Sequence, residues 1–467
     1  MSSSPGRLPL IAGDGLDAPL AWRDGRALSR RQYLADVRAL AARLPDTGPM
    51  LNVTTDRYRF AVGLGAAMLR GQDNLLPPNH TPDTVARLRA LFPGTYGLAD
   101  DDVAHVNLPM IRHPAEAAPL GLDTPAWSGV PCIAGDALAA QVLTSGSTGA
   151  PVPHAKRWGL LVSNAKAGAQ RLAQQMGRGT LAGVTLVATV PAQHMYGFES
   201  SVLVALIGGA AFDAGRPFFP ADIATALARA PRPCMLVTTP FHLKMLLDSG
   251  MALPQIDLTL CATAPLSPQL AARAESLLGA PLMEIYGCTE AGQVASRRTT
   301  EGPEWHTFDG LVLSGDGDHS QVQGGHVPEP TTLADVLEVV DAQTFRLLGR
   351  SNDLINIAGK RGSLSHLNHH LNSIEQVQDG AFWLPPGEDT GGVVRLVAFV
   401  VAPGLSAEAL HGHVLGALRQ RLDPAFLPRR VVAVPMLPRE PTGKLPAGPF
   451  AAWAERTLVH AAARGPV

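Results

Sequence analysis

The residues best suited to chemistry lie in the stretch 141–156, QVLTSGSTGAPVPHAK. An apolar run there ends in a cluster of hydroxyl and glycine residues: Thr144, Ser145, Gly146, Ser147, Thr148 and Gly149. Because glycine has no Cβ, the backbone N–H groups of such a loop can close around an anion. The stretch therefore predicts a buried strand that opens into a polyphosphate-binding loop. A flexible serine- and glycine-rich linker has a similar composition and is the alternative at this point.

This loop differs from the nucleotide-binding motif G-x-x-x-x-G-K-[ST], because no lysine follows Gly149 directly. Lysine is rare in the chain: only five of the 38 basic residues are lysines, at positions 156, 166, 244, 360 and 444. Arginine supplies the routine surface charge. A lysine in a glycine-rich turn is therefore more informative here than in an average protein.

The composition indicates a globular chain without a strong net charge. With 467 residues and 46% apolar content, the chain is long enough for more than one domain and a large core. The formal net charge is -2. Proteins that bind nucleic acids through their phosphates carry a basic surplus, so we expect no nucleic-acid partner.

Cysteine usage and hydropathy bear on the compartment. The four cysteines are scattered without C-x-x-C spacing, which predicts neither a disulfide framework nor a zinc site and fits a reducing compartment. The N-terminus lacks a long apolar segment, and the most apolar windows are too short to cross a bilayer. We therefore expect a cytoplasmic protein without a membrane span.

Helical and strand patterns alternate around the loop. Residues 29–44 have the apolar spacing of an amphipathic helix with Ser29 as its N-cap, and Ser267 followed by Pro268 marks the start of another helix. Strands are predicted at 184–190, 234–239 and 258–263. This alternation predicts an α/β fold whose largely parallel sheet is covered on both faces. Ligands of such folds bind at the carboxyl ends of the strands.

The C-terminal part predicts a second, smaller unit. Its strands are expected at 394–401 and 431–434, with a helix at 406–422 between them. We place the boundary near Arg350, which divides the chain into a core of residues 1–349 and a lid of residues 350–467. The polar, Gly/Pro-rich segment 315–330 just before this boundary predicts a surface loop.

Four further motifs follow the loop: APLS at Ala264, IYGCTEAG at Ile285, LLGRSNDLINIAGKRGSL at Leu347 and PREPTGKLP at Pro438. In this order, the set resembles the adenylate-forming superfamily of acyl- and aryl-CoA synthetases, peptide-synthetase adenylation domains and luciferases. The resemblance spans roughly residues 141–445. It implies a large N-terminal domain with mainly parallel sheets covered by helices. It also implies a small mobile α+β C-terminal domain that pivots near Asn352, with the active site between the two.

The resemblance also implies a reaction. A carboxylate oxygen attacks the α-phosphate of ATP, pyrophosphate leaves, and a thiol opens the resulting mixed anhydride. The negative charge that develops in the first step must be neutralised by positioned groups. The implied cofactors are ATP and Mg²⁺.

By the resemblance, residues 144–149 wrap the β- and γ-phosphates. The family usually has a lysine where this chain has Val152, so Lys156 is a candidate, on spacing alone, to reach the same phosphates. Glu290 resembles the carboxylate that holds Mg²⁺, with Thr144 as a second oxygen ligand, because a hard cation prefers oxygen. Outside this context Glu290 would be an exposed turn carboxylate.

The APLS and IYGCTEAG motifs resemble nucleoside-binding segments, and the residues that they assign to the nucleotide site are Ala264, Tyr286, Gly287 and Thr289. Tyr286 resembles the aromatic residue that packs on adenine, and Thr289 the hydroxyl near the α-phosphate. Asp335 precedes Gly349 by 14 positions, the family interval for the ribose-binding carboxylate, although its lead-in is Leu-Ala. Arg350 resembles the arginine that also reaches the ribose.

The last two motifs carry the groups that resemble moving parts of the active site. Lys444 resembles the lysine that bridges the reacting carboxylate and the α-phosphate, a role suited to a compact charge on a flexible stem. Gly359 and Lys360 resemble the loop that shapes the pantetheine tunnel, where the absence of a side chain at Gly359 leaves room for the thiol arm.

The resemblance places the acid pocket and thiol channel among residues after the second strand and at two strand ends: His194, Tyr196, Glu199, Ala262 and Cys288. His194 is also a catalytic candidate near the carboxylate, although a buried histidine is more often part of a core. The small residues favour an aromatic or short acid. Glu199 could pair with an α-amine, hydrogen-bond a ring hydroxyl or face solvent at a helix N-terminus.

The sequence is also similar to a subgroup of this superfamily, the AMP-ligases of aryl polyene and xanthomonadin-type pigment clusters. The similarity includes the Val-Pro-His variant of the loop and the segments HMYGFESS and WHTFDG. Those enzymes load a hydroxybenzoate-like starter onto an acyl carrier protein. The implied partners are a carboxylic acid and the phosphopantetheine thiol of a carrier protein or CoA. Four arginines could attract an acidic carrier: Arg419, Arg421, Arg429 and Arg430. The alternatives are a CoA ligase for a fatty or amino acid and a catalytically idle nucleotide-binding homologue.

One further pattern stands apart from these motifs. His366, His369 and His370 have i, i+3, i+4 spacing and could meet on one helical face as metal ligands. No other feature of the sequence supports a metal site there.

Overall fold

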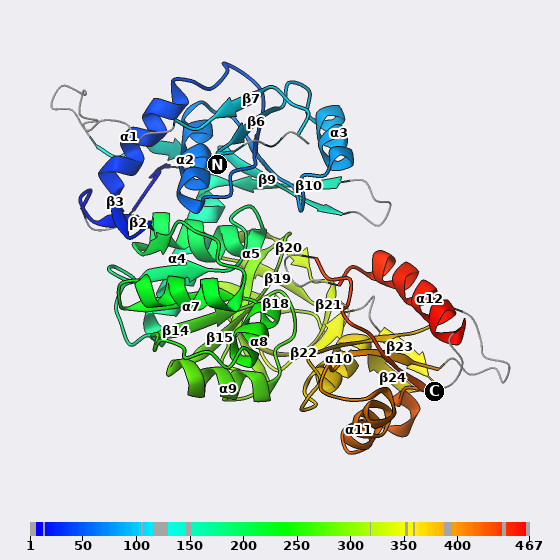
Figure 1. Ribbon diagram of the computed structural model, residues 1–467. Coiled ribbons are helices and arrows are strands. Elements are labelled where there is room, and N and C mark those ends of the chain that lie inside the picture. The colour runs from blue at the N-terminus through cyan, green and yellow to red at the C-terminus, as the bar shows by residue number, and fades with distance from the viewer. Residues whose placement is uncertain are drawn as a thin grey trace.

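Apolar runs and amphipathic helices alternate along the chain, and they form the α/β architecture that the sequence predicts. Figure 1 shows the computed structural model. It describes residues 6–12, 15–101, 103, 106–114, 129–145, 151–317, 319–350, 354–357, 360–386, 395–440 and 445–463. The C-terminal elements, yellow to red in Figure 1, lie to one side of the larger N-terminal part.

The larger sheet has eleven strands. In spatial order they are β21 (Asp335–Val339), β22 (Thr344–Arg350), β17 (Glu304–Thr307), β16 (Gly292–Arg297), β15 (Leu282–Cys288), β14 (Leu258–Cys261), β13 (Cys234–Thr238), β11 (Thr185–Ala188), β12 (Ala211–Asp213), β2 (Pro19–Arg23) and β3 (Arg26–Ser29). The strands from β15 to β2 run parallel, and those beyond them are antiparallel. The predicted parallel sheet is therefore confirmed for the centre.

Both faces of this sheet are covered, as the strand composition requires. The helices involved are α4 (Trp158–Gln175), α7 (Pro220–Arg229), α8 (Pro240–Asp248) and α9 (Pro268–Leu278). Leu236 on β13 packs in a cluster with residues of α7, α8 and α9, whereas its neighbours Met235 and Val237 belong to the cluster that includes α4. Successive side chains of a strand point to opposite faces, so a wholly apolar strand needs cover on both.

One helical segment, on the face of the larger sheet that α4 covers, contains a π-helical turn. It consists of α5 (Met195–Gly197), η1 (Phe198–Leu203) and α6 (Val204–Gly208), and η1 is π-helical. π-helical turns are rare and occur often at functional sites. Glu199 lies within this one.

The second sheet has six strands and carries the glycine-rich stretch at one edge. Its order is β10 (Pro151–Arg157), β9 (Leu138–Ser145), β5 (Asn74–Leu76), β4 (Met50–Asn52), β6 (Tyr96–Ala99) and β7 (Met110–Arg112), with helices α1 (Arg30–Ala41), α2 (Arg57–Leu69) and α3 (Pro82–Leu91). A short pair, β1 (Arg7–Pro9) and β8 (Cys132–Ala134), lies beside it. The predicted N-caps are confirmed, because Ser29 Oγ accepts from Gln32 N and Ser267 Oγ accepts from Leu270 N, both at 3.1 Å.

The prediction of a surface loop at 315–330 is wrong. The segment contributes to a three-stranded sheet made of β18 (Leu311–Ser314), β19 (Gln321–Gly324) and β20 (Val327–Thr332). Val322 and Val327 are buried, and Gly324 and Gly325 turn the chain with positive φ. The glycines and prolines that suggested a loop therefore form the turn and the edge of a hairpin.

The C-terminal part forms a smaller domain. Its elements are β23 (Leu354–Ile357), β24 (Lys360–Ser363), α10 (Leu364–Asn372), β25 (Asp379–Trp383), β26 (Val397–Val401), α11 (Ala407–Arg419), η3 (Pro424–Phe426), β27 (Arg430–Ala433) and α12 (Ala447–Ala463). Its two hydrophobic clusters contain only residues after 354. Lys244 of α8 donates to the Val377 carbonyl and so links the two parts. The boundary near Arg350 and the mobility of this domain stay predictions.

None of the described helices combines the length and apolar character needed to cross a bilayer.

Candidate nucleotide and acid site

The carboxyl ends of the central parallel strands converge on one region. Thr189, after β11, and Thr238, at the end of β13, share a hydrogen bond of 3.0 Å between their hydroxyl groups. Ala262 follows β14, and Tyr286 lies near the end of β15, which is the next strand in the sheet. Because ligands of parallel sheets bind at this end, this is the position expected for the active site.

Tyr286 and Asp335, both predicted to contact the nucleoside, meet in the structure. The Tyr286 hydroxyl donates to Asp335 Oδ2 at 2.8 Å. The Tyr286 ring packs edge-on against Trp305 and Phe345, with centroid distances of 5.9 and 5.4 Å. Asp335 pairs in register with Arg350 across β21 and β22. The aromatic ring and the carboxylate are therefore held together by packing on their own sheet.

Two glycines allow the β15–β16 turn to close. A Cβ at Gly287 would collide with the Gly292 carbonyl oxygen. Gly292 has φ +79°, and a Cβ there would lie 2.8 Å from Glu199 Oε1 and 2.7 Å from Asn164 Nδ2. The turn that carries Thr289 and Glu290 can therefore lie directly over Glu199 only because these positions have no side chain.

The two predicted ligands of Mg²⁺ lie beside the same imidazole ring. His154 Nε2 is 3.0 Å from Thr144 Oγ1 and 3.8 Å from Glu290 Oε1. Burial lowers the pKa of His154, and the Glu290 carboxylate opposes this shift. Sequence reasoning mentioned His154 only as part of a variant loop. The available signal was the alternation of β10, which places His154 on the same face as Val152 and Lys156.

The donor atoms fit Mg²⁺ bound together with a nucleotide. A carboxylate and a hydroxyl are hard oxygen ligands, and the Glu290 side chain is half exposed. Among the described residues there is no cluster of three His, Cys, Asp or Glu that could hold a metal by itself. Mg²⁺ at Thr144 and Glu290 would take its remaining ligands from phosphates and water, as such sites usually do. The side chains of His366 and His369 lie outside the described part, so the histidine hypothesis stays untested.

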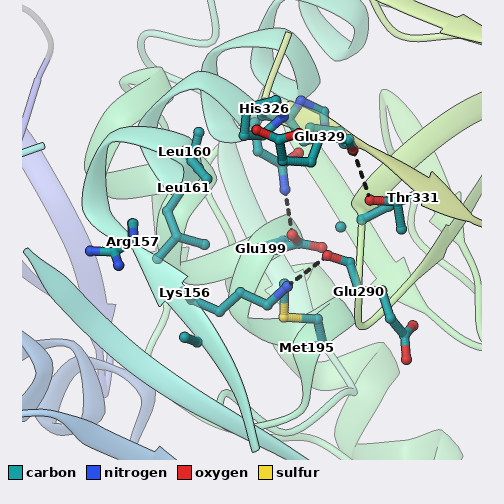
Figure 2. Close-up of a pocket in the computed structure, with 16 residues that line it drawn as sticks. Lys156, Arg157, Leu160, Leu161, Met195, Glu199, Glu290, His326, Glu329 and Thr331 are labelled. Carbon is teal, nitrogen blue, oxygen red and sulfur yellow. Dashed lines mark hydrogen bonds between the residues drawn. The ribbon is translucent and has the colours of Figure 1, made fainter. Parts of the chain in front are cut away.

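Lys156 extends beneath the 289–290 turn. Its Nζ donates to the carbonyl oxygens of Thr289 and Glu290, the latter at 3.3 Å, while the Glu290 carboxylate points away from it (Figure 2). Burial lowers the pKa of Lys156, and the charge of Glu199 opposes this shift. The ammonium group therefore holds the turn from below. Its contact with phosphates stays a prediction, because Nζ would have to leave these carbonyl groups.

A cavity of about 120 Å³ adjoins the turn. Its lining includes Lys156, Leu161, Asn164, Met195, Glu199 and His326 (Figure 2). Asn164 Nδ2 donates to Glu199 Oε1, and burial raises the pKa of Glu199 to about 7 against the opposing charge of Lys156. Asn164 Oδ1 is buried and has no hydrogen-bond partner among the described residues.

Of the five residues predicted to line the acid pocket, Glu199 lines this cavity. The Tyr196 hydroxyl donates instead to the Leu260 carbonyl at 2.9 Å. Cys288 Sγ accepts from Ala291 N, Ala262 is buried, and His194 precedes α5 as its N-cap residue. These four therefore surround the strand ends rather than this cavity, and their predicted roles stay predictions.

Sequence reasoning missed Asn164 and His326 at this site. Asn164 is a polar residue among the apolar buried side chains of α4, and this pattern was the only available signal. His326 lies in the segment mistaken for a loop. Its Nε2 donates to the Gln293 carbonyl at 2.8 Å, and burial lowers its pKa to about 4, so it stays neutral at physiological pH.

The remaining predicted residues lie at the edges of the site or outside the described part. Ala264 is half-buried after β14 and follows Thr263, a β-branched residue with φ +84°. Lys360 is exposed on β24 and pairs with Asp423 of its own domain. Outside the described residues lie Gly146, Ser147, Thr148, Gly149, Asn352, Gly359 and Lys444, together with the side chains of Ser145 and Arg350.

Comparison with known proteins identifies a family and curated relatives of this chain. The family model described as "AMP-binding enzyme" matches residues 81–347. The 4-coumarate–CoA ligase of Halorhodospira halophila is 30% identical over 318 residues, which are 65% of this chain and 73% of that protein. The 4-coumarate–CoA ligase of Rhodobacter capsulatus is 29% identical over 304 residues, 64% of this chain and 73% of that protein.

Solved structures match almost the whole chain. The anthranilate CoA ligase AuaEII in complex with anthranoyl-AMP has a TM-score of 0.79 at 14% identity, over 97% of this chain and 99% of that chain. The O-succinylbenzoate CoA synthetase of Bacillus subtilis in complex with AMP has a TM-score of 0.74 at 18% identity, over 92% and 94%. At these identities the likeness establishes the fold, including the smaller C-terminal domain.

Proposed function

Because the chain belongs to the AMP-binding enzyme family and is an AMP-forming acid–thiol ligase, we propose that it activates a hydroxybenzoate-like aryl acid. We further propose that the acyl group passes to the phosphopantetheine thiol of an acyl carrier protein. The observation that supports the acid is the cavity beneath the 289–290 turn. Its size and its buried polar atoms limit which acids can bind.

The size of the cavity favours a single ring. An apolar cavity of about 150 Å³ can bind benzene. This cavity, of about 120 Å³, is of the same order and is open on one side, so a ring can enter it while the carboxylate stays outside the enclosed part. Leu161 and Met195 supply apolar contacts, as ligand pockets usually do. A long alkyl chain needs considerably more volume, so the cavity argues against a fatty acid.

The polar wall of the cavity favours a hydroxyl group on that ring. Asn164 Oδ1 is a buried acceptor without a partner, an arrangement that costs about 1–3 kcal/mol. A phenolic O–H would donate to it and relieve this cost once the Asn164 amide turns this buried oxygen toward the cavity. An ammonium group is less suitable, because Lys156 already places a positive charge near Glu199. The cavity thus favours a hydroxybenzoate over an amino acid.

In the proposed reaction each group has a physical role. Tyr286 and Asp335 hold the nucleoside, and the turn with Thr289 and Glu290 faces the phosphates. When bound at Thr144 and Glu290, Mg²⁺ neutralises phosphate charge. Lys444 delivers its ammonium between the acid carboxylate and the α-phosphate, which stabilises the charge that develops during attack.

The charge of the C-terminal domain supports a carrier protein as acceptor. Arg419, Arg421, Arg429 and Arg430 are all exposed, near the end of α11 and the start of β27. Arg421 also donates to the Ser373 carbonyl, which limits its movement. Carrier proteins are acidic, and a basic patch accelerates association with such a partner.

Pyrophosphate exchange across an acid panel tests the proposal. The panel contains 3- and 4-hydroxybenzoate, benzoate, 4-aminobenzoate, octanoate and the standard amino acids. We expect kcat/KM for a hydroxybenzoate to exceed that for benzoate by about 100-fold or more, because a site built to bond a hydroxyl rejects the analogue without it. Equal rates with benzoate would contradict the assignment of the polar wall.

A matched pair of variants links this preference to the cavity. Asn164→Leu removes the acceptor and should reduce the preference for hydroxybenzoate over benzoate about tenfold or more. Ser163→Ala changes the exposed neighbour on α4 and should preserve the preference. Exchange with octanoate or an amino acid alone would favour those alternatives. Wild-type enzyme that binds ATP but exchanges with no acid would favour the idle homologue.

A further inference from the structure

His154 lies between two groups that come from distant parts of the chain. Thr144 ends strand β9, whereas Glu290 lies in the turn between β15 and β16 of the other large sheet. His154 Nε2 is 3.0 Å from the Thr144 hydroxyl oxygen and 3.8 Å from the Glu290 carboxylate oxygen. One imidazole atom therefore lies beside a side chain from each sheet.

The register of β10 explains why His154 rather than a neighbour does this. Val152 pairs with Thr144 and His154 with Val142, so Val152, His154 and Lys156 share one face. Val152 is apolar and exposed, and it offers no hydrogen-bonding atom. Lys156 uses its ammonium on two backbone carbonyls. His154 is the member of this row that contacts both side chains.

We propose that His154 is a positioning residue of the nucleotide site that orients the Thr144 hydroxyl, beside the Glu290 carboxylate, as a ligand of the magnesium ion of ATP. This inference rests on the proposed function. An imidazole nitrogen with a lone pair accepts a hydrogen bond from the Thr144 hydroxyl, which leaves the lone pairs of that oxygen for a cation. The His154 side chain is 19% exposed and the Glu290 side chain 49%, so the carboxylate is accessible while the imidazole lies beneath it.

This role predicts a selective loss of metal-dependent binding. Residues that orient metal ligands typically contribute about 10–100-fold to metal affinity. In His154→Leu, we expect the Kd for ATP with Mg²⁺, measured by titration calorimetry without acid substrate, to rise at least tenfold. The Kd for ATP with EDTA should change less than about twofold. The KM for ATP should rise while the KM for the acid is unchanged.

Two further variants control the experiment. His154→Gln places an amide oxygen near the position of Nε2, and it should retain the affinity for ATP with Mg²⁺ within about threefold of wild type. His306→Leu removes an exposed strand histidine of β17 and should have no effect. If His154→Leu does not fold, the comparison of His154→Gln with His154→Ala gives the same test.

The outcomes separate this inference from the proposed function. Equal affinity of wild type and His154→Leu for ATP with Mg²⁺ would overturn the inference alone. Equal losses with and without the metal would also overturn it, because they would show a general structural role. Absence of ATP binding to wild type would overturn the proposed function as well.

Discussion

Burial of charged groups is the main feature of this site at the residue scale. Glu199 is 4% exposed and Lys156 9% exposed, and each shifts the other's pKa. Ionised groups lose hydration when buried and persist only with partners. Here the partners are the Asn164 amide and two backbone carbonyls. Perturbed groups of this kind cluster at functional sites, which is consistent with the proposed acid cavity.

The raised pKa of Glu199 predicts a dependence of stability on pH. The folded state holds the proton up to a pKa of about 7, whereas the unfolded chain releases it near the ordinary value of 4.5. The folded state therefore binds more protons between these values, and stability falls as pH rises through this window. At 1.36 kcal/mol per pKa unit, the free energy of unfolding should fall by roughly 3 kcal/mol.

Glu199→Gln isolates this effect, because its amide does not titrate. The free energies of unfolding of variant and wild type should differ little near pH 4.5, and the variant should be the more stable by roughly 3 kcal/mol at pH 8. Denaturant unfolding from pH 4.5 to 8 measures the difference. Parallel profiles for the two proteins would show that Glu199 does not retain its proton.

Lys444 is the other residue whose role can be tested singly. Lys444→Ala should abolish adenylate formation, because the cation that bridges carboxylate and α-phosphate is lost. It should largely preserve thioester formation from supplied acyl-adenylate, since that step no longer needs the bridge. Pyrophosphate exchange and single-turnover thioester assays measure the two steps separately. Undiminished exchange in the variant would refute the assignment.

At the scale of elements, the site depends on a turn that packs closely on a helix. The β15–β16 turn lies on η1 and α4, and Gly292 is the point of contact. Its positive φ disfavours any L side chain by about 1–2 kcal/mol. The neighbouring Asn164 and Glu199 add a steric cost. The turn and the cavity are therefore coupled through a single glycine.

Gly292→Ala should destabilise the protein and impair acid binding together. The free energy of unfolding should fall by about 2–4 kcal/mol, from the backbone strain and the overpacking. Gly250→Ala is the matched control, since Gly250 also has positive φ but nothing lies within 4 Å of its added Cβ. Denaturant unfolding compares the two variants. Equal losses would show that the contact with Glu199 contributes nothing.

At the scale of the whole molecule, the proposed active site draws on both parts of the chain. The proposed nucleotide and acid residues lie on the N-terminal sheets, while Lys444, by its position in the sequence, and the exposed arginines belong to the C-terminal part. Lys360 is paired with Asp423 within that domain, so a role in the thiol tunnel requires a different pairing. The contact between Lys244 and the Val377 carbonyl fixes one arrangement of the two domains.

Charge reversal on the C-terminal domain should discriminate between thiol acceptors. Arg419→Glu with Arg430→Glu should reduce kcat/KM for a holo-carrier protein about tenfold or more, because attraction to the acidic partner is replaced by repulsion. The rate with CoA should change much less, and added salt should diminish the difference. Arg229→Glu, a single charge reversal at an exposed position of α7, is the control, and each single reversal in the C-terminal domain is compared with it. Equal losses with CoA would argue against the carrier surface.

The sequence by itself determined the local features of this protein. Some features depend only on neighbours that are close in the chain. They are the hydroxyl and glycine residues before Lys156, the N-caps at Ser29 and Ser267, and the alternation of helical and strand periodicity. They were sufficient for the α/β class and the parallel central strands, whereas the hydrogen bond between Tyr286 and Asp335 came from the structure. The local features led to the wrong prediction of a surface loop at 315–330, because glycine and proline occur in hairpin turns as well as in loops.

Only the tertiary structure decided which side chains share a space. Lys156 meets Thr289, Asn164 meets Glu199, and His154 meets Glu290, each across a long stretch of sequence. No local pattern specifies such pairs, because the side chain that a strand or helix presents is defined by the element packed against it. The residue types that carry the chemistry of the motifs could therefore be identified from the sequence. The cavity that selects the acid, and the imidazole beside the metal ligands, came from packing.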